Sequence, residues 1–359
     1  MRTAIVLGTR PEIIKMAPII RAFRRSRADF FVLHTGQHYS RNMDRVFFEN
    51  LRLGSPEYNL EVGSGSHAEE TAAMLVGAER ILSKEEVTGV LVEGDTNSVL
   101  AGALAAAKLR IRVGHVEAGL RSFDRSMPEE LNRIIADHLA DLLYAPTQVA
   151  RSNLVREGVE SSRIKVTGNT IVDSVRQNLA LARKTDTKSI LEGMGSDFLL
   201  TTMHRQENVD NPSRLRGIVR GLESVASATG MKVLYPAHPR STKRMKEFGV
   251  EPARELVRVM QPLDYLTFLK LESEAALVLT DSGGVQEEAC ILEVPCVTLR
   301  DNTERPETVQ VGANLVAGVA PLGIVRAAKA MLGKSGWRNP FGDGRAGVRI
   351  ARSWMSAAG

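Results

Sequence analysis

The stretch that decides the fold is Leu279-Thr-Asp-Ser-Gly-Gly-Val-Gln-Glu-Glu-Ala289. The apolar residues leading into it predict a buried strand, the Ser-Gly-Gly triplet predicts a tight turn, and a helical pattern follows. Such a turn leaves backbone N–H groups open at a helix N-terminus, where the helix dipole favours an anion. We therefore expect this segment to receive a phosphate group, and the same design follows two strands near the start of the chain.

Strand and helix patterns alternate along the chain and restart in its second half. This alternation predicts an α/β protein with two doubly wound, Rossmann-like domains that face a cleft, which we place at residues 1–170 and 171–344. Ligands in such sheets bind beyond the carboxyl ends of the strands, so functional side chains should follow strands directly. The predicted strands are 3–7, 30–34, 87–92, 111–116, 164–167, 197–202, 231–235, 256–260, 276–280 and 295–299, and the predicted helices are 11–25, 96–108, 129–143, 212–228, 264–273, 284–292 and 345–357.

Composition narrows the class of protein. The chain has 359 residues with a net charge of +5, which suits an anionic ligand, and only 5% aromatic residues, which argues against single-stranded nucleic acid as a partner. No apolar run is long enough to span a bilayer, and the first residues form a core strand rather than a signal segment, so we expect a cytoplasmic protein. Cys290 and Cys296 have neither metal-site nor disulfide spacing and are expected to be reduced core residues.

A dinucleotide site is not expected. The letters of residues 63–68 match the glycine pattern of the dinucleotide fingerprint, but no buried strand precedes them. A loop that caps a helix over 67–82 accounts for the same residues. We therefore predict no cofactor and no metal.

In the first half, charged residues follow predicted strands. Arg10 comes after the first strand and Lys15 lies one helical turn further on, although a plain strand–helix turn with two surface cations is an alternative. Asp95 and Glu117 follow two later strands, and capping is the alternative role for Asp95. Glu129 begins a helix, where an ion pair with Arg133 four positions later is its alternative role. Like charges in one pocket raise each other's pKa, which suits carboxylates to acid and base work.

The second half offers phosphate ligands. His204 follows a strand and is a candidate phosphate donor or acid, and His238 lies at another strand end. Ser282-Gly283-Gly284 forms the phosphate turn, and Glu288, one turn later, suits the two hydroxyls of a ribose. Arg305 lies in a Thr-Glu-Arg-Pro-Glu segment that echoes Gly-Thr-Arg-Pro-Glu at residues 8–12.

These motifs, together with Glu-Gly-Asp-Thr at 93–96, His-Val-Glu-Ala-Gly-Leu-Arg at 115–121 and Pro-Glu-Glu-x-Asn-Arg at 128–133, resemble the non-hydrolysing UDP-N-acetylglucosamine 2-epimerases. The resemblance runs from the first residues to about residue 310. It implies a GT-B fold in which the last helix, within 345–359, packs back onto the N-terminal domain. It also implies interconversion of UDP-N-acetylglucosamine and UDP-N-acetylmannosamine for polysaccharide synthesis, with those nucleotide sugars as partners, no membrane partner and a homodimeric assembly.

The resemblance also implies a role for each candidate. The C2 proton of the sugar is not acidic, so UDP would leave C1 as C2 loses its proton, and UDP would then add back to the glucal. The acid, base and catalytic candidates are Asp95, Glu117, Glu129, His204 and Arg133. The candidates for binding UDP are Arg10, Lys15, Phe268, Ser282, Gly283, Gly284, Glu288 and Arg305.

Two segments depart from the common bacterial form. The residues after His38 differ, and the loop between Glu117 and Pro128 is shorter, which puts substrate activation at a second site in doubt. Gln37, His38 and His238 are the candidates for such an allosteric site. Alternatives to the epimerase are a hydrolysing epimerase, a GT-B glycosyltransferase and a non-enzymatic nucleotide-sugar sensor.

Overall fold

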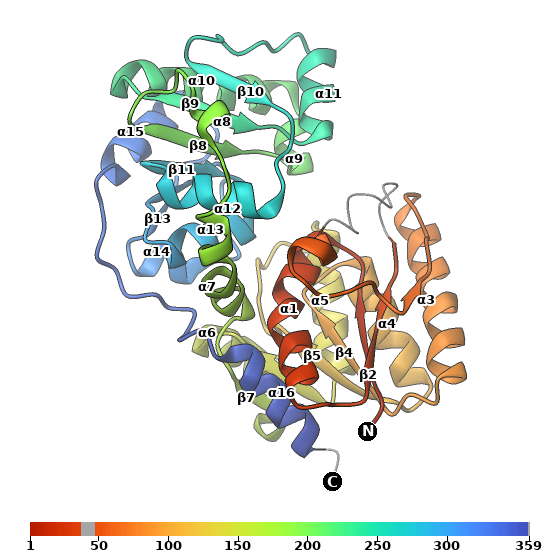
Figure 1. The fold of residues 1–359 in the computed structure, drawn as a ribbon. Coiled ribbons are helices and arrows are strands. Elements are labelled where there is room, and N and C mark those ends of the chain that lie inside the picture. Colours follow the sequence, from red (N-terminus) through yellow and green to blue (C-terminus); the bar gives the residue numbers. More distant parts are fainter. Residues whose placement is uncertain (37–46, 358–359) are drawn as a thin grey trace. The chain divides into compact units, whose positions relative to one another are not determined.

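The protein consists of two compact α/β units (Figure 1). The computed structural model describes residues 1–36 and 47–357. The N-terminal unit contains Met1–Arg176 and the C-terminal segment that starts at Phe341, and the C-terminal unit contains Gln177–Pro340.

The described part of the N-terminal unit forms a seven-stranded parallel sheet in the order β3-β2-β1-β4-β5-β6-β7. This order places the switch point of a doubly wound sheet between β1 and β4. Its strands are β1 (Thr3–Leu7), β2 (Phe30–His34), β3 (Tyr58–Asn59), β4 (Gly89–Glu93), β5 (Arg112–Val116), β6 (Leu142–Ala145) and β7 (Ile164–Val166). Its helices are α1 (Arg10–Arg25), α3 (His67–Lys84), α4 (Asn97–Lys108), α5 (Pro128–Leu139), α6 (Gln148–Arg156), α7 (Thr170–Ala182) and α16 (Ala346–Ser356), with a 3₁₀ turn at Ser161–Arg163.

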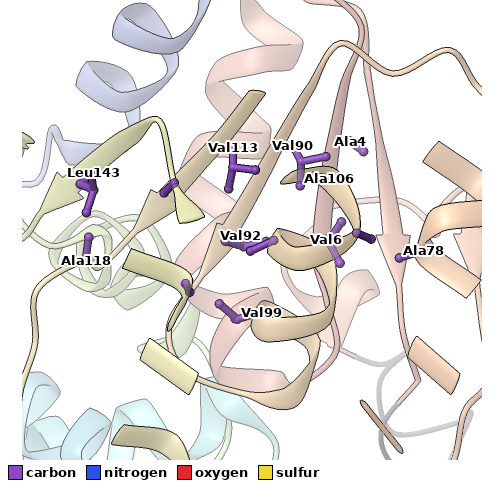
Figure 2. Packing of buried hydrophobic residues seen from close by; sticks show 14 of the residues in the cluster. Ala4, Val6, Ala78, Val90, Val92, Val99, Ala106, Val113, Ala118 and Leu143 are labelled. Atoms are coloured by element: carbon purple, nitrogen blue, oxygen red, sulfur yellow. The ribbon is translucent and has the colours of Figure 1, made fainter. Parts of the chain in front are cut away.

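Alternate residues of each strand point to opposite faces of this sheet. On one face, Val6 and Val92 pack against the small residues of α4, among them Ala103 and Ala106 (Figure 2). Small side chains on α4 allow the helix to lie close to the sheet. That close packing fixes the loops that follow β1 and β4.

The opposite face is covered by α1 and α16, which contact each other. Trp354 of α16 is fully buried, and a Cβ added to Gly89 or Gly114 would lie 2.7 Å from its ring. The glycines of β4 and β5 therefore make room for the indole, which anchors the C-terminal helix on the sheet.

The predicted helix over 129–143 is wrong in its last four residues, 140–143. The helix ends at Leu139, Ala140 is extended, and Leu142–Ala145 forms β6 between β5 and β7. All four residues of β6 are buried, because this strand is covered on both faces.

The C-terminal unit, every residue of which the structure describes, has a six-stranded parallel sheet in the order β10-β9-β8-β11-β12-β13. The switch point here lies between β8 and β11. One face packs against α10 and α15, and the other packs against α12 and α13. The strands are β8 (Phe198–Thr202), β9 (Lys232–Pro236), β10 (Val257–Met260), β11 (Leu277–Thr280), β12 (Cys296–Thr298) and β13 (Asn314–Val316). The helices are α8 (Lys188–Leu191), α9 (Gln206–Val209), α10 (Pro212–Thr229), α11 (Pro239–Glu247), α12 (Tyr265–Glu274), α13 (Gly283–Ile291), α14 (Pro306–Gln310) and α15 (Pro321–Met331).

Both sheets confirm the predicted fold class of two doubly wound α/β domains. Among the described residues, no helix combines the length and apolar character needed to cross a bilayer.

Candidate active site

In the N-terminal unit, Glu12 joins the two loops at the switch point. Its carboxylate accepts hydrogen bonds from Gly8 N at 2.9 Å, Thr9 N at 2.6 Å and Thr96 Oγ1 at 2.7 Å. Burial raises the pKa of Glu12 to about 7, although these hydrogen bonds oppose the shift. Glu12 therefore fixes the loop that precedes Arg10 relative to the loop that carries Asp95.

Asp95 follows β4 and pairs with a buried arginine. The Arg133 guanidinium of α5 donates to the Asp95 carboxylate, and its other terminal nitrogen lies 2.8 Å from Glu130 Oε2. Asn132 Nδ2 donates to the Asp95 carbonyl at 3.0 Å. Arg133 thus binds Asp95 and Glu130, while Glu129, half-buried on the first turn of α5, forms no ion pair with Arg133 within the described residues.

Glu117 lies directly after β5 with its backbone in the left-handed region, at φ 65°. This conformation is uncommon outside glycine and frequent at functional sites. The Lys15 ammonium donates to Glu117 Oε2, and Asn169 Nδ2 donates to the same oxygen at 3.3 Å. Lys15 is buried, and its Nζ also lies 3.7 Å from Glu93 Oε1, so this ammonium group interacts with two carboxyl groups of the N-terminal unit.

Sequence reasoning missed His115, which connects β5 to the Asp95 loop. Its ring is fully buried, with Nδ1 2.7 Å from Asp137 Oδ1 and Nε2 2.8 Å from the Gly94 carbonyl oxygen. Asp137 also pairs with Arg121 at 2.7 Å. A histidine inside an otherwise apolar strand was the available signal, since buried polar groups need partners.

In the C-terminal unit, Asp281 organises the switch point. This buried carboxylate accepts hydrogen bonds from His204 N at 3.1 Å, Arg205 N at 3.0 Å and Asn208 Nδ2 at 3.1 Å. Burial opposes its ionisation, but the hydrogen bonds and the His204 ring lower the pKa of Asp281. His204 itself is exposed, and its ring lies 6.2 Å from the exposed ring of His238.

The expected phosphate turn is the start of α13. Ser282 is the N-cap residue and Gly283 begins the helix, so the first N–H groups of α13 lie at the carboxyl end of β11. Thr280 Oγ1 accepts from Ser282 N at 3.0 Å and holds the turn against the strand. An open helix N-terminus at a switch point is suited to phosphate.

The two glycines of this turn differ in their surroundings. A Cβ on Gly283 would lie 2.8 Å from Glu304 Oε1, whereas the first atom near a Cβ on Gly284 is Ser282 Oγ at 4.0 Å. The protein thus leaves room for a side chain at Gly284 but not at Gly283.

If the start of α13 receives the phosphate as predicted, we expect Gly283→Ala to weaken both folding and UDP binding, and Gly284→Ala to weaken UDP binding alone, by about tenfold or more, because a methyl group would fill the space that the phosphate needs. Calorimetric titration with UDP, paired with thermal unfolding, measures both quantities. Unchanged UDP affinity in Gly284→Ala would place the phosphate elsewhere.

The remaining predicted UDP ligands occupy different environments. Arg305 is buried and its Nε lies 2.7 Å from Glu287 Oε1, so it is an internal ion-pair partner. Glu288 is buried on α13, and Phe268 is half-buried on α12 in the apolar cluster shared with α13. Arg10 lies with its guanidinium carbon 5.3 Å from the Phe47 ring centroid.

Two predicted allosteric residues, Gln37 and His38, lie outside the described residues. Over residues 1–36 and 47–357 there is no cluster of three or more metal-ligating side chains.

Two doubly wound units, with charged clusters at the switch points of both sheets, define a GT-B-like α/β protein. Residues 21–354 match the family described as UDP-N-acetylglucosamine 2-epimerase. The UDP-N-acetylglucosamine 2-epimerase of Methanocaldococcus jannaschii is 52% identical over 98% of both chains. The crystal structure of that organism's UDP-GlcNAc 2-epimerase in complex with UDP-GlcNAc and UDP has a TM-score of 0.95, covering 99% of this chain and 100% of that one, at 52% identity. A third relative, the UDP-2,3-diacetamido-2,3-dideoxy-D-glucuronate 2-epimerase of Pseudomonas aeruginosa, is 41% identical over 98% of both chains. The chain belongs to the UDP-N-acetylglucosamine 2-epimerase family.

Proposed function

We propose that this protein is a non-hydrolysing epimerase that inverts C2 of UDP-N-acetylglucosamine to give UDP-N-acetylmannosamine, reversibly. The observation that carries the proposal is the set of carboxylates Asp95, Glu117 and Glu93 at neighbouring strand ends, each of them beside a buried cation. An epimerase needs such groups, whereas a nucleotide-sugar sensor would need only the α13 turn. The names of the relatives, which share the whole length of the chain, agree with this assignment.

The reaction proceeds by elimination and re-addition. A carboxylate takes the proton from C2, the C–H electrons form the C1–C2 double bond, and the C1–O bond breaks with its electrons leaving on UDP. UDP then adds back to C1 of the 2-acetamidoglucal while C2 receives a proton on its other face. Asp95, Glu117 and Glu129 are the proton carriers in this proposal, because general acid–base work requires positioned carboxyl groups.

The departing UDP carries the negative charge that develops in the transition state. In this proposal the backbone N–H groups of Gly283 and Gly284 and the exposed ring of His204 bind it, since charge is stabilised by donors aimed where it develops. Glu288 is the ligand for the ribose and Phe268 borders the uracil. Arg10 acts on the diphosphate, while Lys15, Arg133 and Arg305 act through the carboxylates they touch.

We further propose a homodimeric, cytoplasmic enzyme that supplies N-acetylmannosamine-type sugars for surface polysaccharide synthesis. A nucleotide sugar is made and used in the cytoplasm, which supports the location. Light scattering of the purified protein tests the dimer, and a mass of one chain would contradict it.

Incubation with UDP-N-acetylglucosamine in deuterated water tests the reaction. We expect UDP-N-acetylmannosamine, with deuterium at C2 of both sugars, because the C2 proton passes through a carboxyl group that exchanges with solvent. Mass spectrometry and proton NMR measure the products. Lack of C2 exchange in folded protein would contradict the proposal, release of free sugar would indicate hydrolysis, and binding without turnover would indicate a sensor.

The Pseudomonas aeruginosa relative supports a second candidate substrate, UDP-2,3-diacetamido-2,3-dideoxy-D-glucuronate. Epimerisation at C2 follows the same steps, and the sugars differ at C3 and C6. Comparing kcat/KM for the two nucleotide sugars decides between them, since kcat/KM expresses preference for the competing substrates.

A further inference from the structure

Glu93 is a buried carboxyl group that the sequence motifs do not assign to catalysis. It is the last residue of β4, two positions before Asp95, and it is 1% exposed. Within the described residues, its Oε1 has no hydrogen-bond partner, and the Lys15 ammonium lies 3.7 Å from it. Burying a charged carboxylate without a hydrogen bond costs more free energy than burying a neutral carboxyl group. A protonated Glu93 therefore fits this site better than an ionised one.

Among the described residues, the Lys15 ammonium lies next to two carboxyl groups. Lys15 donates directly to Glu117, which also accepts from Asn169, whereas Glu93 receives neither bond. One ammonium balances one negative charge, so the second carboxyl group retains a proton. The hydrogen bonds assign the charge to Glu117 and the proton to Glu93.

The charged surroundings of Glu93 favour the same distribution. Burial raises the pKa of Glu93 well above its ordinary value, Lys15 opposes this shift, and the carboxyl groups of Glu117, Glu12 and Asp95 add to it. These groups come from the residue after β5, from α1 and from the loop after β4.

We propose that Glu93 is an additional acid–base residue of this enzyme, which exchanges a proton with Glu117 through the Lys15 ammonium. In this exchange, an N–H bond of Lys15 breaks as an O–H bond forms on Glu117, which leaves a neutral amine with a lone pair. The O–H bond of Glu93 then breaks as a new N–H bond forms on Lys15, which restores the ammonium and leaves Glu93 as a carboxylate. The total charge of the cluster stays constant, so Glu117 alternates between base and acid without a change in the charge of the buried site.

This role answers a requirement of C2 inversion. One group removes a proton from one face of the sugar and another adds a proton to the opposite face, so a single turnover leaves the two groups in exchanged protonation states. Glu117 is buried, and a neighbouring proton reservoir restores its starting form. The inference rests on the proposed epimerase function.

The test is Glu93→Gln, which keeps the size of the side chain but carries no exchangeable acid proton. We expect kcat for epimerisation and for C2 deuterium exchange to fall about 10- to 100-fold. KM and UDP affinity should change little, and the kcat–pH profile should lose one of its limbs. An unchanged kcat and an unchanged pH profile would overturn the inference.

If Glu93→Gln does not fold, Glu93→Asp and Glu93→Asn provide a size-matched pair in which only Asp carries a proton. The inference requires a higher kcat for Glu93→Asp, and equal values would overturn it. The unsubstituted enzyme is assayed alongside. If it shows no epimerisation, the proposed function fails, whereas a working wild type with an equally active Glu93→Gln variant contradicts the role of Glu93 alone.

Discussion

Replacing Asp95 by Asn is expected to lower kcat for epimerisation by about 10²- to 10⁴-fold, the usual contribution of a positioned acid or base. The amide keeps the shape of the side chain but can neither accept the C2 proton nor balance Arg133, which pairs with Asp95 in the structure. UDP binding should stay within about threefold of wild type, because Asp95 is not among the proposed diphosphate ligands. Proton NMR of C2 exchange and calorimetric titration with UDP measure the two quantities.

The matched control is Asp29→Asn. Asp29 is exposed and precedes β2, at the opposite end of the sheet, where its carbonyl accepts from Thr3 N. The same chemical change there should leave kcat unaltered. Wild-type turnover in Asp95→Asn would remove Asp95 from the catalytic residues.

The sequence predicts the fold well where burial and local chemistry agree. The bounds of β1 and β2 match the prediction, because each is a short apolar run, and Pro11 marks the start of the following helix. The sequence predicts helix for residues 142–143, which belong to the strand Leu142–Ala145, because a short apolar run suits both a buried strand and a continuing helix. Only pairing with β5 and β7 decides between them, and that pairing is not a local property.

In the candidate site, too, the sequence predicts what is local and not what depends on contacts between distant segments. The sequence places Asp95, Glu117 and Ser282 directly after strands, and they lie there in the structure. It does not reveal that Lys15 contacts Glu117, because these residues are 102 positions apart and meet only when α1 packs on the sheet. Charged residues within apolar strands, such as Glu93 and His115, are the signal that a buried network exists.

Glu304 is the buried carboxylate of an ion-pair cluster in the C-terminal unit. Its buried carboxylate lies 2.7 Å from Arg205 Nη2 and 2.5 Å from Arg300 Nη1, beside the start of α13. Burial opposes ionisation, but Arg205, Arg305 and Arg300 together lower the pKa of Glu304 far below its ordinary value. A depressed pKa means that this stabilisation is present above the ordinary carboxyl pKa and is lost only as the pH falls through the lower folded-state value.

Glu304→Gln is therefore expected to lower the free energy of unfolding of the C-terminal unit by about 3–5 kcal/mol at neutral pH, because buried arginines lose their counter-charge. The deficit should shrink in strong acid, where wild-type Glu304 is itself protonated. Urea unfolding, with hydrogen exchange over α13 to locate the loss, measures the effect.

Asp301→Asn is the control: this carboxylate pairs with Arg214 at 2.8 Å but is 67% exposed, so its loss should cost at most about 1 kcal/mol. Equal losses in the two variants would show that the buried cluster around Glu304 contributes no more than a surface ion pair.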